Sequence, residues 1–147
     1  MRVSVIGGGV VDQGTYDVAE HVGRLLGTRG HDVICGGLSG VMEAVGKGMA
    51  ETGGQTIGIL PGNDPKAANS YIDVPIATGI GSARNVFVVK NGAAAIAIDG
   101  ATGTLSEIAH ALDMGKPIAG LDTHDIEGVE SVTTPEAAVE YVETAVE

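Results

Sequence analysis

Three glycine-rich turns, each placed between a short apolar strand and a helix, constrain the fold of this chain most. The turns are Gly7-Gly8-Gly9, Cys35 to Gly40 and Asp99 to Thr104, after predicted strands at 2–6, 32–35 and 93–98. In an open parallel sheet such turns lie together at the carboxyl ends of the strands, so all three can converge on one ligand. The alternative is that the glycines serve only tight turns and close helix–strand packing.

The third turn has the layout of a phosphate-binding loop. Leu105, Ile108 and Leu112 follow helical spacing after it, which places the backbone amides of the turn at a helix N-terminus. The positive end of the helix dipole favours an anion there, and small residues let a ligand oxygen approach the backbone. The same stretch also fits a capping box, in which Thr104 caps the helix and Glu107 reaches back to a free amide. In that case the role of Glu107 is structural.

Strands and helices alternate along the rest of the chain. The remaining predicted strands are 56–60, 72–75, 117–120 and 129–132, and the predicted helices are 15–27, 38–52, 82–91, 103–114 and 135–146. This alternation predicts an α/β fold, a Rossmann-like three-layer α/β/α sandwich with a mostly parallel sheet, formed by residues 1–147 as a single domain. The loop at 61–71 follows a strand end and is predicted to cover a ligand.

Four sequence blocks together resemble the LOG-like (Lonely Guy) family. In chain order they are Gly36-Gly37 with Gly40-Val41-Met42-Glu43, the run from Gly53 to Pro61, Arg84 with its flanking helix, and Gly100-x-x-Gly103-Thr104-x-x-Glu107. The family is also labelled "possible lysine decarboxylase", and its wider group includes the molybdenum cofactor carrier proteins. The resemblance covers nearly the whole chain and implies the same fold. Nothing marks a lysine as a Schiff-base anchor for pyridoxal phosphate, so a lysine decarboxylase is not expected.

The phosphoribohydrolases of this family carry a motif from which the chain departs. Asp99 and Ala101 stand where those enzymes have a proline and a second glycine, and Asn85 stands where they have a lysine. The arginine and glutamate that the resemblance implies as catalytic are retained as Arg84 and Glu107. The segment around this arginine is more similar to the carrier-like, nucleotide-binding branch.

The resemblance therefore predicts a carrier-like protein that binds a phosphorylated ligand, a nucleotide or a molybdopterin-like cofactor, across the carboxyl ends of its strands. The implied ligand- and phosphate-binding residues are Gly8, Gly9, Gly36, Gly37, Gly40, Met42, Glu43, Arg84, Gly100, Thr102, Gly103 and Thr104. The turn from Gly100 onward is expected to hold the phosphate, and Arg84 to supply a positive charge. Glu43 is either stabilised by the helix dipole or binds a ribose hydroxyl. No cofactor is expected to be required for function.

The enzyme alternative is a LOG-type phosphoribohydrolase that cleaves the N-glycosidic bond of a nucleoside 5′-monophosphate. Glu107 would then place or activate a water, and Arg84 would counter negative charge. In a third alternative, a structural oligomer with a vestigial site, Arg84 and the glycine turns have no use.

The net charge of the chain indicates which classes of partner it is unsuited to bind. Nineteen Asp and Glu against eight Lys and Arg give a net charge of −11, which argues against nucleic acid and an anionic membrane surface. The acidic residues are spread over helices and the carboxyl tail, and we interpret this surface as halophilic.

Several further expectations follow from the residues. The chain opens without a signal-peptide layout and has no apolar run of the about 20 residues that span a bilayer, so a cytoplasmic location is expected. The lone Cys35 is expected to be a buried small hydrophobe. The cluster at 122–125 is predicted to be a polar turn and not a metal site. The small-residue surface of the helix at 38–52 predicts at least a homodimer.

Overall fold

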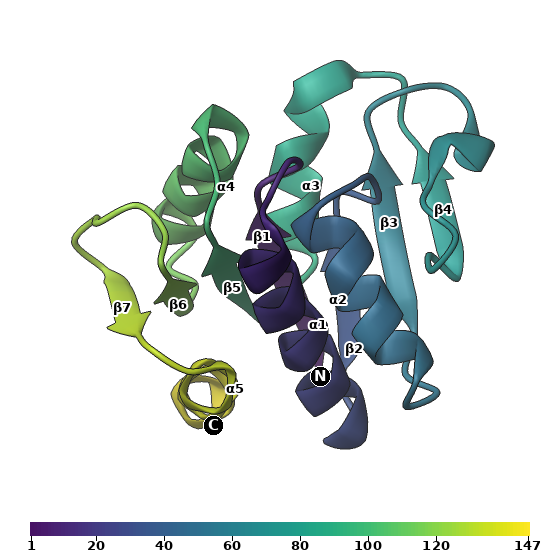
Figure 1. Cartoon of the computed structure of the whole chain (residues 1–147). Helices are drawn as coiled ribbons and strands as arrows, with labels where there is room; N and C mark the ends of the chain where they lie inside the picture. The colour runs from purple at the N-terminus through teal and green to yellow at the C-terminus, as the bar shows by residue number, and fades with distance from the viewer.

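The computed structural model describes all 147 residues as one sheet covered by helices on both faces (Figure 1). The seven strands are all parallel, in the order β4-β3-β2-β1-β5-β6-β7. Their bounds are β1 (Arg2–Gly7), β2 (Asp32–Cys35), β3 (Thr56–Leu60), β4 (Val74–Ala77), β5 (Ala94–Ile98), β6 (Ile118–Leu121) and β7 (Val129–Val132). The strand order reverses between β1 and β5, and a ligand crevice is expected at the carboxyl ends of the strands at such a switch point.

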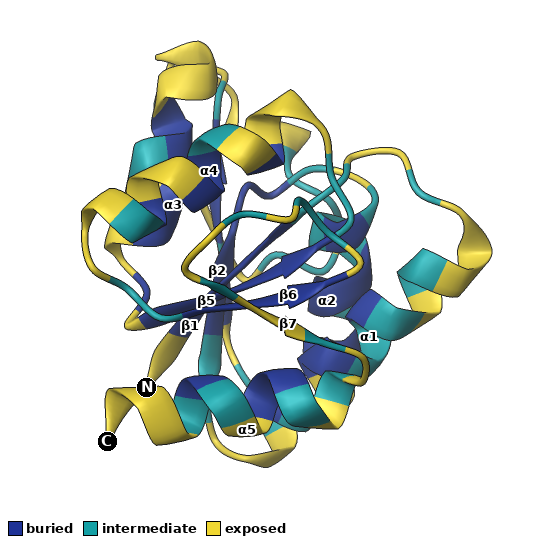
Figure 2. Ribbon diagram, turned by 90° about the vertical axis from the view of Figure 1, so that its left-hand side faces the viewer, coloured by how far each residue is buried: buried dark blue, intermediate teal, exposed yellow.

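Helices cover both faces of the sheet and confirm the predicted Rossmann-like three-layer sandwich (Figure 2). One face carries α1 (Gln13–Thr28), α2 (Val41–Ala50) and α5 (Pro135–Val146), and the other carries α3 (Asn85–Lys90) and α4 (Thr102–Asp113). Two short 3-10 helices, η1 (Pro65–Ala67) and η2 (Gly81–Arg84), lie before and after β4. The core under the first face has 19 buried residues and that under the second has 10, so most apolar burial lies beneath α1, α2 and α5.

Strand β5 shows why the central strands are continuous apolar runs. All five of its residues are buried. Ala94, Ile96 and Ile98 belong to the core beneath α1 and α5, whereas Ala95 and Ala97 belong to the core beneath α3 and α4. A central parallel strand is covered on both faces, so it has no position that favours a polar residue.

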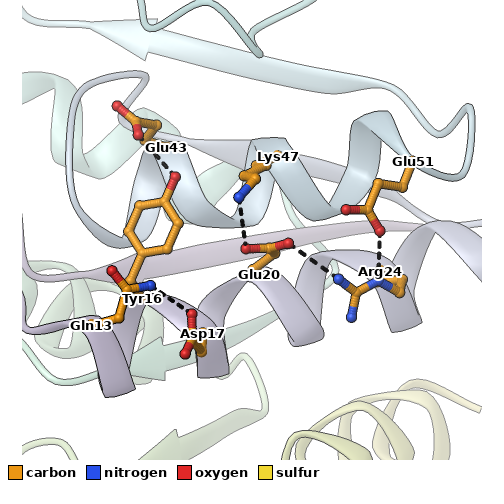
Figure 3. Close-up of polar contacts among 8 residues, drawn as sticks. All are labelled: Gln13, Tyr16, Asp17, Glu20, Arg24, Glu43, Lys47 and Glu51. Atoms are coloured by element: carbon orange, nitrogen blue, oxygen red, sulfur yellow. Dashed lines mark hydrogen bonds and ion pairs between the residues drawn. The ribbon is translucent and has the colours of Figure 1, made fainter.

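Helices α1 and α2 approach each other closely through glycines. A Cβ at Gly48 of α2 would overlap the carbonyl oxygen of Glu20, and one at Gly23 of α1 would overlap that of Val45. Polar pairs also join the two helices, including Glu20 with Lys47 at 3.3 Å (Figure 3). The small-residue surface of α2 is therefore used within the chain. The predicted homo-oligomer stays a prediction, and it needs a different surface.

Four predicted elements match the structure at both ends. They are the strands at 32–35, 56–60 and 129–132 and the helix at 135–146. The helix predicted at 82–91 is wrong in part, because the chain there forms η2 and then the short α3. Strand β4 lies two residues later than predicted, and just before it the Asp73 carboxylate accepts the amide of Thr56 at 2.8 Å.

A helix that crosses a bilayer must be about 20 residues long and predominantly apolar. None of the helices is both long enough and apolar enough to cross a membrane.

Candidate functional site

A cavity of about 470 Å³ lies at the carboxyl ends of β1, β2 and β5, where the strand order reverses. The predicted site residues that line it are Gly8, Gly9, Gly36, Met42, Arg84, Gly100, Gly103, Thr104 and Glu107. Those outside the lining are Gly37, Gly40, Glu43 and Thr102. Residues of all three glycine-rich turns border the cavity, because each turn follows a strand of one parallel sheet.

The β5–α4 turn enters its helix without a side-chain cap. Asp99 and Gly100 have positive φ angles of 53° and 111°, and a Cβ at Gly100 would overlap the side chain of Thr104. The chain therefore bends sharply, and α4 already begins at Thr102, with Ala101 as its uncapped flanking residue. The capping-box alternative is wrong, because Thr104 is the third residue of the helix and packs against Gly100.

The first turn of α4 has free backbone donors beside the cavity. Leu105 donates its amide to the carbonyl oxygen of Ala101 at 3.0 Å, whereas the amides of the three preceding residues have no acceptor in the chain. Two of those three, Gly103 and Thr104, line the cavity. Unpaired amides at the positive end of a helix dipole are the elements of an anion-binding site.

A polar turn braces this loop from outside the cavity. Thr123 donates its hydroxyl to the carbonyl oxygen of Asp99 at 2.7 Å, and His124 Nε2 lies 2.9 Å from that of Ala101. The structure places no group of three or more His, Cys, Asp or Glu side chains where they could hold a metal ion. The polar turn predicted at 122–125 thus supports the backbone of the β5–α4 turn.

The β2–α2 turn is covered by the chain itself. Asn69 donates its amide to the carbonyl oxygen of Gly37 at 3.0 Å and its side-chain Nδ2 to that of Leu38 at 2.7 Å. No residue of the loop at 61–71 lines the cavity. The expectation that this loop covers the cavity is therefore wrong, because its polar groups bond to the β2–α2 turn instead.

Arg84 is the only Lys, Arg or His side chain that lines the cavity, and it is 9% exposed. Its Nε donates to the carbonyl oxygen of Ile59 at 2.8 Å, Nη1 donates to Asn85 Oδ1, and Nη2 lies 3.4 Å from the carbonyl oxygen of Gly36. Burial lowers the pKa of Arg84, and the nearby Glu107 opposes this shift. The guanidinium is thus anchored at the ends of β2 and β3 and keeps one N–H on each terminal nitrogen for a ligand.

Asn85 connects this arginine to α4. Its Oδ1 accepts from Arg84, its Nδ2 donates to Ser106 Oγ at 3.2 Å, and Ser106 donates in turn to the carbonyl oxygen of Gly103 at 2.7 Å. Asn85 is buried and lines the cavity. Asp99 also lines the cavity. Neither was among the predicted site residues, although the sequence marks both as departures from the hydrolase motif.

Glu107 is a buried carboxylate that lines the cavity. It is 7% exposed and has no hydrogen-bond or ion-pair partner in the chain. Burial raises its pKa to about 7, against the opposing effect of Arg84. Glu43 differs, because its carboxylate accepts the hydroxyl of Tyr16 at 2.8 Å, on the α1 side of α2 (Figure 3).

The fold and cavity define a Rossmann-like α/β protein with an anion-suited crevice at its switch point. The model of the SLOG cluster4 family matches residues 1–147, and the chain belongs to this family. It is 46% identical over 142 residues to an uncharacterized protein of Archaeoglobus fulgidus, covering 96% of this chain and 93% of that protein.

Two solved structures share the fold over nearly their whole length. The molybdenum cofactor binding protein from the phototrophic bacterium Rippkaea orientalis has a TM-score of 0.93 at 30% identity, covering 99% of this chain and 97% of that one. The molybdenum cofactor carrier protein of Chlamydomonas reinhardtii has a TM-score of 0.89 at 31% identity, covering 97% and 96%. The predicted resemblance to the LOG-like group and its carrier proteins is confirmed.

Proposed function

We propose that this protein is a carrier for a phosphorylated, nucleotide-type ligand, with a pterin of the molybdenum cofactor kind as the preferred cargo. The observation that carries the proposal is the uncapped N-terminus of α4, whose free amides border a cavity with Arg84 as its one cation. The two solved structures named for molybdenum cofactor binding or carriage support the choice of cargo. The phosphate would lie against Gly103 and Thr104, and the ring would extend toward Gly36 and Met42.

The size and charge of the cavity fit such a ligand. A volume of about 470 Å³ lies within the range of small-molecule sites. With a net charge of −11, the chain as a whole repels anions, so attraction must come from local donors. The free amides and the two remaining N–H groups of Arg84 are such donors, and charge-assisted hydrogen bonds of this kind are stronger than neutral ones.

Hydrolysis of a nucleoside 5′-monophosphate is the second candidate. It is favoured by one observation, the buried Glu107 with a pKa near neutrality in the same cavity as Arg84, which suits a general acid or base. Carriage is preferred because Asp99, Ala101 and Asn85 replace the hydrolase residues around this pair.

Native mass spectrometry of freshly purified protein tests the proposal. A retained species with the mass of a phosphorylated pterin is expected, and a nucleotide would differ from it in mass. Purified protein is also incubated with common nucleoside 5′-monophosphates, and release of free base is followed by chromatography. Steady release of base that is lost in Glu107→Gln would replace carriage with hydrolysis. Failure to retain or bind any phosphorylated ligand would overturn both candidates.

A further inference from the structure

Glu107 borders the proposed phosphate site without a counter-ion of its own. Two other ionisable groups lie near it, Arg84 from η2 and Cys35 from the end of β2, and Asp99, just after β5, lines the same cavity. The buried Cys35 thiol has its pKa raised to about 12, so it is neutral near pH 7. β6 contributes no titratable side chain, β1 contributes only Arg2, which is exposed at the opposite end of that strand, and His110, on α4 itself, is exposed.

Arg84 does not neutralise Glu107 directly. Its three hydrogen bonds go to two backbone carbonyl oxygens and to Asn85, and no ion pair joins the two side chains. An anionic ligand that reaches the first turn of α4 therefore meets a second, unpaired acid, which is itself buried in the cavity wall. Two like charges at close range in such a place cannot both be kept, and the less costly outcome is protonation of one of them.

We propose that Glu107 binds the ligand as the neutral acid, donating its O–H to a phosphate oxygen, so that the protein takes up one proton with each anion it binds. This inference rests on the proposed function. The proton comes from solvent and resides on a carboxylate oxygen of Glu107, and no covalent bond to the ligand is formed. The site would thus discriminate in favour of ligand groups that accept hydrogen bonds.

The expected pH dependence has a definite sign. The pKa of Glu107 is about 7 in the free protein, and a bound anion raises it further. Below that value the acid already holds its proton, and its ionisation adds no pH dependence to binding. Above it each pH unit weakens binding by about tenfold, until the pKa in the complex is reached. The release of cargo is therefore favoured as the pH rises above neutrality.

Isothermal titration calorimetry with guanosine 5′-monophosphate tests this inference. Titrations at pH 8 in buffers of different ionisation enthalpy give the number of protons taken up, and the expected value for the wild type is close to one. Glu107→Gln keeps a donor without the charge, so it should take up none and bind about tenfold more tightly than the wild type at pH 8. At pH 6 the two should bind alike.

The matched control is Glu140→Gln on the exposed face of α5, which should keep the proton uptake of the wild type. If Glu107→Gln fails to fold, the proton uptake of the wild type at pH 8 tests the inference by itself. Binding without proton uptake would overturn the inference and leave the proposed function standing. Absence of wild-type binding of guanosine 5′-monophosphate at both pH values would overturn the inference, and the proposed function falls with it if native mass spectrometry also finds no phosphorylated ligand.

Discussion

The β2–α2 and β5–α4 turns are both glycine-rich, both follow a buried strand and both open a helix, yet the chain closes one and leaves the other open. At the β2–α2 turn Val41 donates its amide to the carbonyl oxygen of Gly8 at 2.9 Å, and Asn69 bonds to Gly37. Neither helix has a side-chain cap, but at the β5–α4 turn none of the first three amides has an acceptor in the chain.

The difference lies in what approaches each turn from elsewhere in the chain. Gly40 lies against the backbone of the β1–α1 loop, where any side chain would overlap the carbonyl oxygen of Gly8. Gly103 has only Asn85 Nδ2 near a Cβ position, at 3.8 Å, which is ordinary contact. Gly40 of the β2–α2 turn therefore serves packing, whereas Gly103 of the β5–α4 turn leaves space for a ligand.

Alanine should destabilise the folded protein far more at Gly40 than at Gly103. Gly40 has φ 65° and ψ −125°, so Gly40→Ala combines backbone strain with a backbone clash and should cost about 3 kcal/mol or more. Gly103→Ala should change stability by less than about 1 kcal/mol, because alanine favours a helix. Urea unfolding of the two variants measures this contrast. Equal losses would mean that the β5–α4 turn is as closely packed as the other.

Glu107→Gln should stabilise the folded protein at pH 8. Burial raises the pKa of Glu107 from 4.5 to about 7, so the folded state keeps a proton that the unfolded chain releases across that window. Stability contributed by this group therefore falls as the pH rises from about 4.5 to 7, by roughly 3 kcal/mol at most. Thermal melts at pH 4.5 and pH 8 should show the gain of the variant only at pH 8. A gain of equal size at both pH values would contradict an ionised, buried carboxylate.

Arg84→Ala should weaken binding of a nucleoside monophosphate by about 1.5–3 kcal/mol, the range for a hydrogen bond to a charged group. The affinity should therefore fall at least tenfold. Because Arg84 also holds two backbone carbonyls, a melting curve must accompany the calorimetry. Lys66→Ala, which removes an exposed cation outside the cavity, is the control and should bind like the wild type. Equal losses in both variants would point to general electrostatics and not to this site.

Ser106→Ala should have the smallest effect. It removes the link from Asn85 to the carbonyl oxygen of Gly103, and a lost neutral hydrogen bond is worth about 1 kcal/mol. Ligand affinity should fall by about fivefold with little change in melting temperature, since alanine favours a helix. An unchanged affinity would show that this link does not orient the open turn.

Local features of the sequence were sufficient for most elements. Helix α5 begins where it is predicted to begin, because Thr134 accepts the amide of Ala137 and Pro135 takes the first helical position. The fully apolar run of β5 predicts a central strand covered on both faces, as observed. The start of α4 could not be read from local spacing, because Thr104 and Glu107 have the spacing of a capping box, whereas the sharp bend at Asp99 and Gly100 lets the helix begin at Thr102.

By itself, the sequence determined the strand–helix alternation, the parallel sheet and the gathering of its glycine-rich turns at one edge, because these depend on periodicity and on residues close in the chain. Only the tertiary structure decided which turn stays open and which acid lacks a partner. Those outcomes depend on atoms far apart in sequence: Asn69 closes the turn at Gly37, and Tyr16 engages Glu43 while Glu107 has no partner. No local pattern specifies such contacts, since they arise only when the helices pack against the sheet.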